Sequence, residues 1–161
     1  TKDGTVTAGN ASQISDGAAV LLLSDVITAA KFSRRPPLAR IVAFAVHSQA
    51  PEWYTTAPVG AIRNVLGTAG LSVQDIDLFE INEAFAVVPL FAMRELGIPH
   101  EKVNIWGGAI AQGHPIGASG ARIVGNLVYQ LIHTGGRYGI AVACNGGGEA
   151  VAVLVENWRG K

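Results

Sequence analysis

The chain has 161 residues, which suits one ordinary domain or a domain with a piece of its neighbour. Its 12 basic and 12 acidic residues cancel, and no apolar run approaches the roughly 20 residues that cross a bilayer, so neither nucleic acid nor a membrane is an expected partner. The single cysteine excludes an internal disulfide and agrees with a reducing compartment. We expect the cytoplasm, with a mitochondrial or peroxisomal location left open. The start on Thr1 rather than Met hints at a processed or truncated product.

The first third of the chain contains two apolar runs that predict buried strands, over residues 18–24 and 41–47. Between them, the pair at 36–37 is Pro-Pro, which interrupts any helix and marks the best candidate boundary. The apolar spacing over residues 59–69 then predicts a helix that ends at Gly70.

The middle of the chain predicts alternating strands and helices. Residues 77–81 are typical of a third strand, after which Asn82 is expected to cap a helix that stops at Gly97. Residues 103–106 predict a short fourth strand. Residues 117–133 predict a long helix that is apolar or small on nearly every side, so we expect it at the centre of the protein, packed on all faces.

The end of the chain carries a strong hairpin signal. Strand-like runs over residues 138–144 and 149–156 flank the dipeptide Asn145-Gly146. Strands and helices therefore alternate along the chain until two strands close it. That order predicts an α/β fold with a mixed, largely parallel sheet and helices on both faces.

The most informative residue is His114, which is surrounded by glycine and alanine over residues 107–121. Small neighbours let backbone or a flat ligand approach the imidazole closely. Pro115 biases the histidine towards an extended backbone just before a helix can begin. A histidine at a helix start could merely satisfy backbone groups, but this density of small residues favours acid–base chemistry. The other three histidines have no comparable setting and are expected to be structural (His47, His100 and His133).

Cys144 is followed directly by an asparagine and three glycines, residues 145–148. Successive amides in a glycine turn can point at a developing oxyanion. An unperturbed thiol has a pKa of about 8.5, so Cys144 needs a cationic or polar neighbour to exchange protons at neutral pH. The alternative is a tight hairpin that merely tolerates a cysteine.

Two further segments have both a functional and a purely structural interpretation. Residues 82–85, Asn-Glu-Ala-Phe, directly follow a predicted strand, where sites in α/β sheets collect; a plain helix N-cap explains them equally well. The polar loop over residues 5–12 could line a ligand cleft or only cap a helix, and periodicity does not decide between the two.

Together these four segments resemble the thiolase family over essentially the whole chain. Residues 107–120 are similar to the family's histidine block, residues 82–85 to its asparagine block, and residues 144–148 to its second-cysteine block. Residues 5–16 resemble the stretch that touches coenzyme A. Residues 52–58 look closer to the acetoacetyl-CoA (acetyl-CoA C-acetyltransferase) type than to long-chain members.

The resemblance implies a catalytic role for each of four residues. His114 would activate the nucleophilic cysteine and help to bind the thioester oxygen, and Asn82 would hold a water in the same oxyanion hole. Cys144 would be the acid–base thiol that moves the proton at the carbon next to the carbonyl. The amide of Gly146 would be a donor of the second oxyanion hole.

The resemblance also implies the substrates. Phe85 would shape the acyl pocket, while Ala11 and Ser12 would lie along the pantetheine arm of coenzyme A. The reaction would be thiolysis of a 3-ketoacyl-CoA or its reverse, a Claisen condensation of two acyl-CoA molecules. Coenzyme A thioesters would be substrates, with no permanently bound cofactor and no metal.

The single cysteine is a large departure from the family. A thiolase has two similar halves in a five-layered fold, and its nucleophilic cysteine lies in the first half, whereas Cys144 belongs to the second. We therefore expect residues 39–161 to form the C-terminal thiolase domain and residues 1–38 to be the tail of the N-terminal half. Alone the chain is expected to be inactive; its partners would be that half and further copies in a homo-oligomer. The alternative is a non-catalytic acyl-CoA-binding or interaction protein, against which the intact His114, Cys144 and Asn82 speak.

Overall fold

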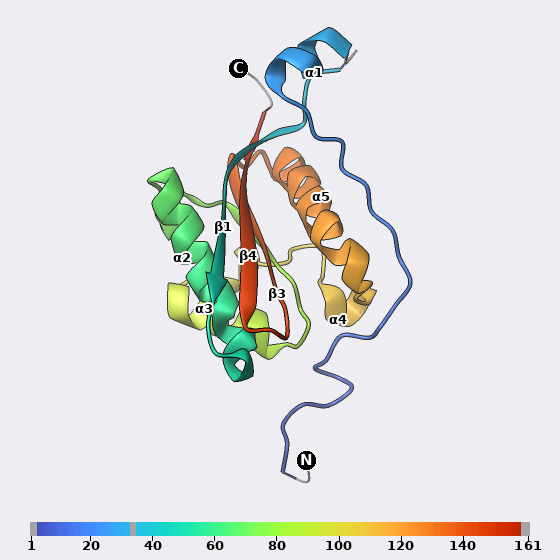
Figure 1. The fold of residues 1–161 in the computed structure, drawn as a ribbon, viewed down its shortest axis with the longest axis vertical. Helices are drawn as coiled ribbons and strands as arrows, with labels where there is room; N and C mark the ends of the chain where they lie inside the picture. The colour runs from blue at the N-terminus through green and yellow to red at the C-terminus, as the bar shows by residue number, and fades with distance from the viewer. Residues whose placement is uncertain (1–2, 33–34, 159–161) are drawn as a thin grey trace.

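The computed structural model describes residues 3–32 and 35–158, which begin as an extended segment and end in a strand hairpin (Figure 1). Short 3-10 turns cover Pro51–Thr56, Val73–Asp75 and His100–Lys102. The helices and strands in chain order are α1 (Val26–Phe32), β1 (Ala39–Ser48), α2 (Ala57–Ala69), β2 (Leu78–Ile81), α3 (Val87–Leu96), α4 (Ala109–Gln112), α5 (Ile116–Thr134), β3 (Tyr138–Cys144) and β4 (Glu149–Asn157).

The four strands form one sheet in the order β1-β4-β3-β2. β4 is antiparallel to both β1 and β3, whereas β2 and β3 are parallel. The predicted mixed α/β sheet is confirmed, but its description as largely parallel is wrong, because one of the three described pairs is parallel. The tight turn forces β3 and β4 to be antiparallel, and only β2 and β3 are joined by a long crossover that allows the parallel sense.

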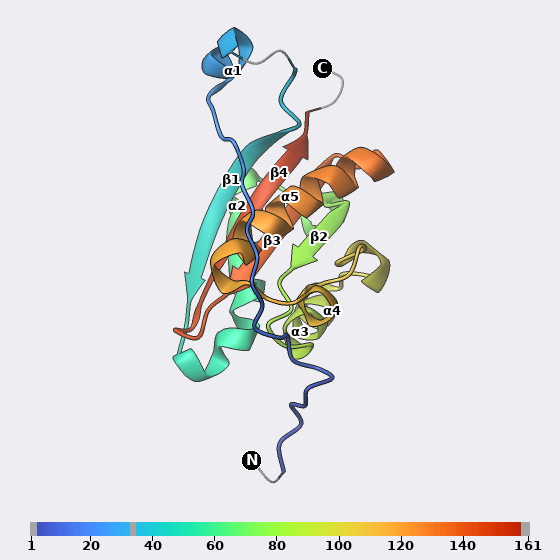
Figure 2. The same ribbon diagram turned by 90° about the vertical axis from the view of Figure 1, so that its right-hand side faces the viewer.

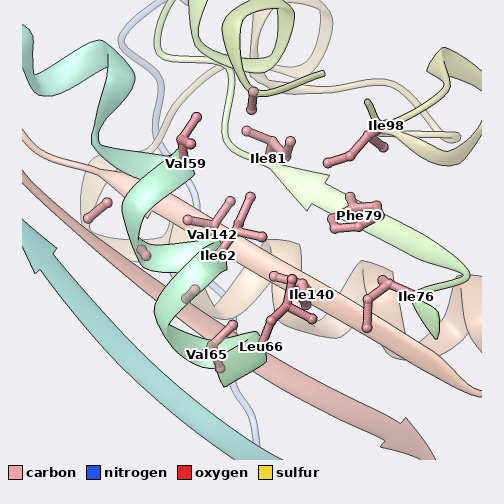
Figure 3. Close-up of a cluster of buried hydrophobic side chains, with 14 of the residues drawn as sticks. Val59, Ile62, Val65, Leu66, Ile76, Phe79, Ile81, Ile98, Ile140 and Val142 are labelled. Atoms are coloured by element: carbon pink, nitrogen blue, oxygen red, sulfur yellow. The ribbon is translucent and has the colours of Figure 1, made fainter. Parts of the chain in front are cut away.

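Helices cover both faces of the sheet, as predicted, with α2 on one side and α5 on the other (Figure 1). The alternation of side chains along β2 explains how one strand serves both layers. Phe79 and Ile81 pack with Ile62 of α2 in the larger core cluster (Figure 3). Leu78 points the other way and packs with Leu127 of α5.

The predicted helices over residues 59–69 and 117–133 are confirmed as α2 and α5. The predicted helix end at Gly97 is confirmed too, since this glycine follows α3 with a left-handed φ of 65°. The prediction that Asn82 caps the helix is wrong: α3 begins at Val87, with Ala86 as its N-cap. Asn82 instead continues the path of β2, so its side chain is available for another use.

Two predicted strands do not form. Residues 18–24 are extended but pair with no strand among the described residues, and Leu22 is 97% exposed. An apolar run becomes a buried strand only where a neighbouring strand accepts it, so this prediction is wrong for a tertiary reason. Of residues 103–106 only Val103 forms a bridge, to Phe79, before the chain turns away.

The sheet face on the α5 side is covered only in part. α5 packs over β2 and β3, whereas Phe44 and Val46 of β1 and Val151 of β4 are exposed on the same side. We call these three side chains the open apolar face. α5 itself exposes Tyr129, so within this chain it is not packed on every side as predicted. None of the described helices is long and apolar enough to span a membrane.

Candidate functional site

Asn82 and His114 meet where the parallel strands end. Asn82 follows β2, and its backbone amide donates to Val142 of β3 at 2.9 Å. His114 lies just before α5. The side-chain Nδ2 of Asn82 is 3.4 Å from Nε2 of His114. The two residues therefore form a polar pair at the carboxyl edge of β2 and β3, where α/β proteins commonly place their sites.

The hydrogen bonds around His114 define which ring nitrogen carries the proton. Nδ1 lies 2.6 Å from the hydroxyl of Ser119, and that hydroxyl donates its only proton to the carbonyl of Pro115 at 3.0 Å. Nδ1 is consequently the donor to Ser119, which leaves a lone pair on Nε2. This lone pair faces the amide of Asn82, so Nε2 is a proton acceptor placed in the site.

The environment of His114 also favours the neutral ring. Burial lowers the pKa of His114 below its ordinary value of 6.5, and the positive charge of Arg122 lowers it further. Both effects disfavour the imidazolium. His114 is therefore neutral at pH 7 and can act as a general base through Nε2.

Asn82 is a buried amide with an unused acceptor. The residue is 2% exposed, and its Oδ1 accepts no hydrogen bond from any described residue. A buried oxygen without a donor is a group that an ordered water or a substrate commonly satisfies. Beside the Nε2 lone pair, this arrangement can bind a small polar group.

Cys144 ends β3, two residues beyond the point where Val142 receives the Asn82 amide. Its side chain packs against the core on the α2 side, as does that of Phe85. Burial raises the pKa of the Cys144 thiol, so the group is protonated at neutral pH. The structure gives Cys144 no cationic neighbour among the described residues that would lower this pKa. The approach of Cys144 to His114 stays a prediction.

The turn after Cys144 is held by its own hydrogen bonds. Asn145 donates to Glu149 at both backbone and side chain, and its Oδ1 accepts from the Gly147 amide at 2.8 Å. Gly148 has a φ of 91°, and a Cβ there would collide with the carbonyl oxygen of Gln49. The Gly146 amide donates to no acceptor among the described residues and is exposed, so it can donate to a ligand.

The other predicted binding residues lie beside the Asn82 loop. Phe85 makes an edge-to-face contact with Tyr54, with ring centroids 6.4 Å apart, and Ala11 forms a single antiparallel bridge with Phe85. Ser12 donates from both its amide and its hydroxyl to the Ala84 carbonyl at 3.0 Å. The structure thus groups Ala11, Ser12 and Phe85, with the Ser12 hydroxyl turned towards the protein.

The Tyr54 ring adds a contact that the sequence did not indicate. Burial raises the pKa of the Tyr54 phenol, and the neighbouring Cys144 raises it further. Tyr54 therefore contacts Phe85 and is close enough to Cys144 for their charges to interact.

Asn104 is a supporting residue that the sequence analysis missed. Among the described residues, Asn104 is the one non-glycine residue with a positive φ, 49°. Its side chain makes the hydrogen bonds that a neighbouring strand would make at the end of β2. Its Oδ1 accepts from the Ile81 amide at 2.8 Å, and its Nδ2 donates to the Ile81 carbonyl and to Oε1 of Glu83. Asparagine tolerates left-handed backbone, but no spacing in the sequence singles out this position.

Glu83 extends that support towards the histidine loop. Its Oε2 accepts from the Ile110 amide at 3.1 Å, at the start of α4, and a Cβ at Gly108 would collide with its carboxylate. Glu83 therefore joins the Asn82 loop to the start of α4 and does not lie in the first turn of α3. The only signal for this contact was the pair of glycines at 107–108, which permits close approach.

Comparison with known proteins places these features in context. A model of the thiolase C-terminal domain matches residues 35–157, and a model of the thiolase N-terminal domain matches residues 1–26. The chain is 49% identical over 157 residues to a probable acetyl-CoA acetyltransferase of Dictyostelium discoideum, covering 97% of this chain and 37% of that protein. It is 47% identical over 156 residues to the mitochondrial 3-ketoacyl-CoA thiolase of Homo sapiens, covering 97% of this chain and 39% of that protein.

Solved structures agree with the fold. The crystal structure of the Bacillus anthracis acetyl-CoA acetyltransferase superposes with a TM-score of 0.92 at 45% identity, covering 96% of this chain and 39% of that one. The human mitochondrial 3-ketoacyl-CoA thiolase in complex with CoA gives 0.89 at 43% identity, covering 98% and 40%. The chain thus spans about two fifths of the length of the relatives it matches. The fold class predicted from the sequence is confirmed.

Proposed function

Because the chain belongs to the thiolase family, we propose that it supplies the acid–base and oxyanion-binding part of an acyl-transfer site that acts on coenzyme A thioesters. The reaction is thiolysis of a 3-ketoacyl-CoA or the reverse Claisen condensation of acyl-CoA molecules. The observation that carries this proposal is the contact of 3.4 Å between Nδ2 of Asn82 and Nε2 of His114. A neutral base beside an amide suits both proton transfer and the binding of an oxyanion.

The proposed thiolysis begins with a cysteine of the N-terminal thiolase half, which loses its proton to Nε2 of His114. The resulting thiolate attacks the 3-keto carbonyl, whose oxygen is held by the Gly146 amide, while His114 and Asn82 hold the thioester oxygen. The bond between C2 and C3 then breaks, and its electron pair passes to C2 as the enolate of acetyl-CoA. Cys144 gives its proton to this carbon and becomes a thiolate.

The second half of the proposed cycle restores both groups. The Cys144 thiolate takes the proton of an incoming coenzyme A thiol, and the coenzyme A sulfur attacks the acyl-cysteine. The acyl group leaves as acyl-CoA, and the released cysteine sulfur regains its proton from His114. The directions of the two pKa values suit this cycle, because it requires His114 neutral and Cys144 protonated at its start.

Substrate contacts and partners form part of the same proposal. Ala11 and Ser12 would lie along pantetheine, Phe85 would shape the acyl pocket, and the Gly146 amide would donate to the oxyanion formed at the 3-keto carbon. Among the described residues no group of three or more His, Cys, Asp or Glu side chains is arranged to hold a metal. We propose coenzyme A thioesters as substrates, with no resident cofactor, and the cytoplasm as the compartment.

The domain arrangement is proposed as well. Residues 39–161 would form the C-terminal domain, and residues 1–38 would be the end of the N-terminal half, on the same or a separate chain. The open apolar face formed by Phe44, Val46 and Val151 lies beside α5 and would be covered by that half. Assembly into a homo-oligomer is proposed from the resemblance to the family.

Substitution of His114 tests the catalytic proposal. The chain is combined with a thiolase N-terminal half, and thiolysis of acetoacetyl-CoA is followed by loss of its absorbance. His114→Gln should lower kcat by about a hundredfold or more, the scale on which general bases contribute. His100→Ala, at an exposed histidine, is the matched control and should leave kcat unchanged. Equal rates for the wild type and His114→Gln would contradict the proposal, and coenzyme A binding without turnover would favour the non-catalytic alternative.

A further inference from the structure

We propose that residues 10–14, here called the strap, are a positioning element that holds His114 against Asn82. The inference rests on the proposed function for the role of these two residues. It adds that their contact depends on a third segment, which crosses in front of the start of α5 (Figure 2).

One side of the strap pairs with the loop that carries Asn82. The strap and residues 84–86 form a short antiparallel ladder around the bridge between Ala11 and Phe85. Two backbone hydrogen bonds of 3.0 and 2.9 Å close this ladder, donated by the amides of Ser12 and Ala86. These bonds fix the backbone immediately after Asn82.

The other side of the strap pairs with His114 itself. The His114 amide donates to the Gln13 carbonyl at 2.8 Å, and Ile14 forms a parallel bridge with His114. Within the described parts of the chain, no backbone hydrogen bond joins residues 82–86 directly to residues 113–115. The strap is therefore the backbone connection between the two loops whose side chains meet at 3.4 Å.

Gly113 makes this close approach possible. It is buried with a φ of 84°, and a Cβ there would collide with the hydroxyl of Ser15 and lie 2.8 Å from its Cβ. Gly107 has the same φ of 84°, but a Cβ there would meet only Gln112 Nε2 at 3.6 Å. The two glycines thus share a positive φ and differ in whether the chain just beyond the strap passes over them.

The strap contributes little to the core of the fold. Gln13 is exposed and Ile14 is 92% exposed, and neither belongs to the two clusters of buried apolar side chains. Loss of the strap should consequently alter the loops at the site and leave the sheet and its helices in place.

The test compares four forms of the full chain by amide hydrogen exchange and by NMR of the His114 ring. Gly113→Ala should displace the strap, raise the exchange rate of the His114 amide by about tenfold or more, and shift the Nε2 signal. Gly107→Ala also places an alanine at positive φ, without the collision, and should leave both readings within about twofold of wild type. The double variant Ser15→Gly with Gly113→Ala removes the collision but keeps the backbone strain at residue 113, so both readings should move back towards wild type without reaching it.

A further variant, Ser12→Pro, tests the proposal independently if Gly113→Ala fails to fold. Ser12→Pro removes the amide that donates to Ala84 and leaves Gly113 untouched; it should also expose the His114 amide to exchange. Unchanged His114 exchange and ring signals in a folded Gly113→Ala or Ser12→Pro chain would overturn the proposal. The proposal would also be overturned if the His114 exchange and ring signals of the double variant showed no return towards wild type. None of these readings measures acyl transfer, so failure of the strap and failure of the proposed function are distinguishable.

Discussion

The hydroxyl of Ser119 accepts a hydrogen bond of 2.6 Å from Nδ1 of His114 while donating to the Pro115 carbonyl, and this relay places the imidazole lone pair on Nε2. Ser119 is buried on the first turn of α5, five residues beyond the histidine. A residue that never faces the substrate therefore determines which nitrogen can act as the base.

Ser119→Ala tests this relay. Without the hydroxyl, Nδ1 loses its acceptor, so we expect a mixture of tautomers in the ¹⁵N spectrum of His114 and a fall in thiolysis of about tenfold or more in the recombined enzyme. Ser48→Ala, at an exposed serine of β1, is the control. An unchanged pattern of His114 ring nitrogens in Ser119→Ala would show that the serine does not set the tautomer.

Glu80 should make stability depend on pH. Burial on the α5 side of β2 raises its pKa from 4.5 to about 7, opposed by the hydrogen bond of 2.6 Å from Gln130. The folded state therefore keeps a proton that the unfolded chain releases, and the free energy of unfolding falls as pH rises from 4.5 to 7. At about 1.4 kcal/mol per pKa unit, Glu80 contributes a fall of roughly 3 kcal/mol.

Urea unfolding of wild type and Glu80→Gln between pH 4.5 and 8 measures this contribution. The stability of wild type relative to the variant should decline by roughly 3 kcal/mol across the range and level off above pH 7. Glu95→Gln, on the exposed side of α3, should follow the wild-type curve. Parallel curves for wild type and Glu80→Gln would contradict the assignment.

The turn after Cys144 contains a matched pair of glycines. Gly148→Ala combines a φ of 91° with a collision against Gln49 and should destabilise the chain by about 2–3 kcal/mol. Gly146→Ala meets nothing within 4 Å, keeps its amide, and should change the free energy of unfolding by less than about 0.5 kcal/mol. Thermal denaturation of both variants measures these changes in the free energy of unfolding. Equal losses of stability would mean that the turn conformation does not depend on Gly148.

The open apolar face should cause self-association when it is uncovered. Phe44 is 72% exposed beside Val46, and α5 leaves both uncovered. Phe44→Ser should shift the sedimentation of the isolated chain at micromolar concentration towards monomer, because burial of this ring drives the contact. Leu90→Ser, at an exposed apolar residue of α3, should not. A wild-type chain that sediments as a well-behaved monomer would argue against this surface.

Local signals in the sequence predicted the elements that depend on local physics. The left-handed Gly70 ends α2, and the left-handed Gly148 lies in the β3–β4 turn that Asn145-Gly146 predicted, because glycine adopts this conformation at little cost. The apolar run over residues 18–24 led to the wrong prediction of a buried strand, since an extended apolar run becomes a strand only when a neighbouring strand pairs with it. Pairing is a tertiary property, and no residue type in the run encodes it.

The candidate site, like the fold, could be predicted from the sequence only in part. Glycine density predicted the importance of His114, and the structure adds its contact with Asn82. The support from Asn104 and the strap consists of long-range bonds, many of them made by backbone atoms, which any residue type provides. The sequence marks that support only through glycines that must lack a Cβ, such as Gly113.

We propose that this chain provides the base, the oxyanion donors and the proton-donating thiol of a thiolase site, and that the nucleophile comes from an N-terminal half. The most direct measurement is the rate of acetoacetyl-CoA thiolysis by the 161-residue chain, alone and with a separately produced thiolase N-terminal half. We expect no turnover by the chain alone and coenzyme A-dependent turnover by the pair, lost again when the cysteine of that half is replaced. Robust thiolysis by the chain alone, or a stable complex of the two halves without turnover, would contradict it.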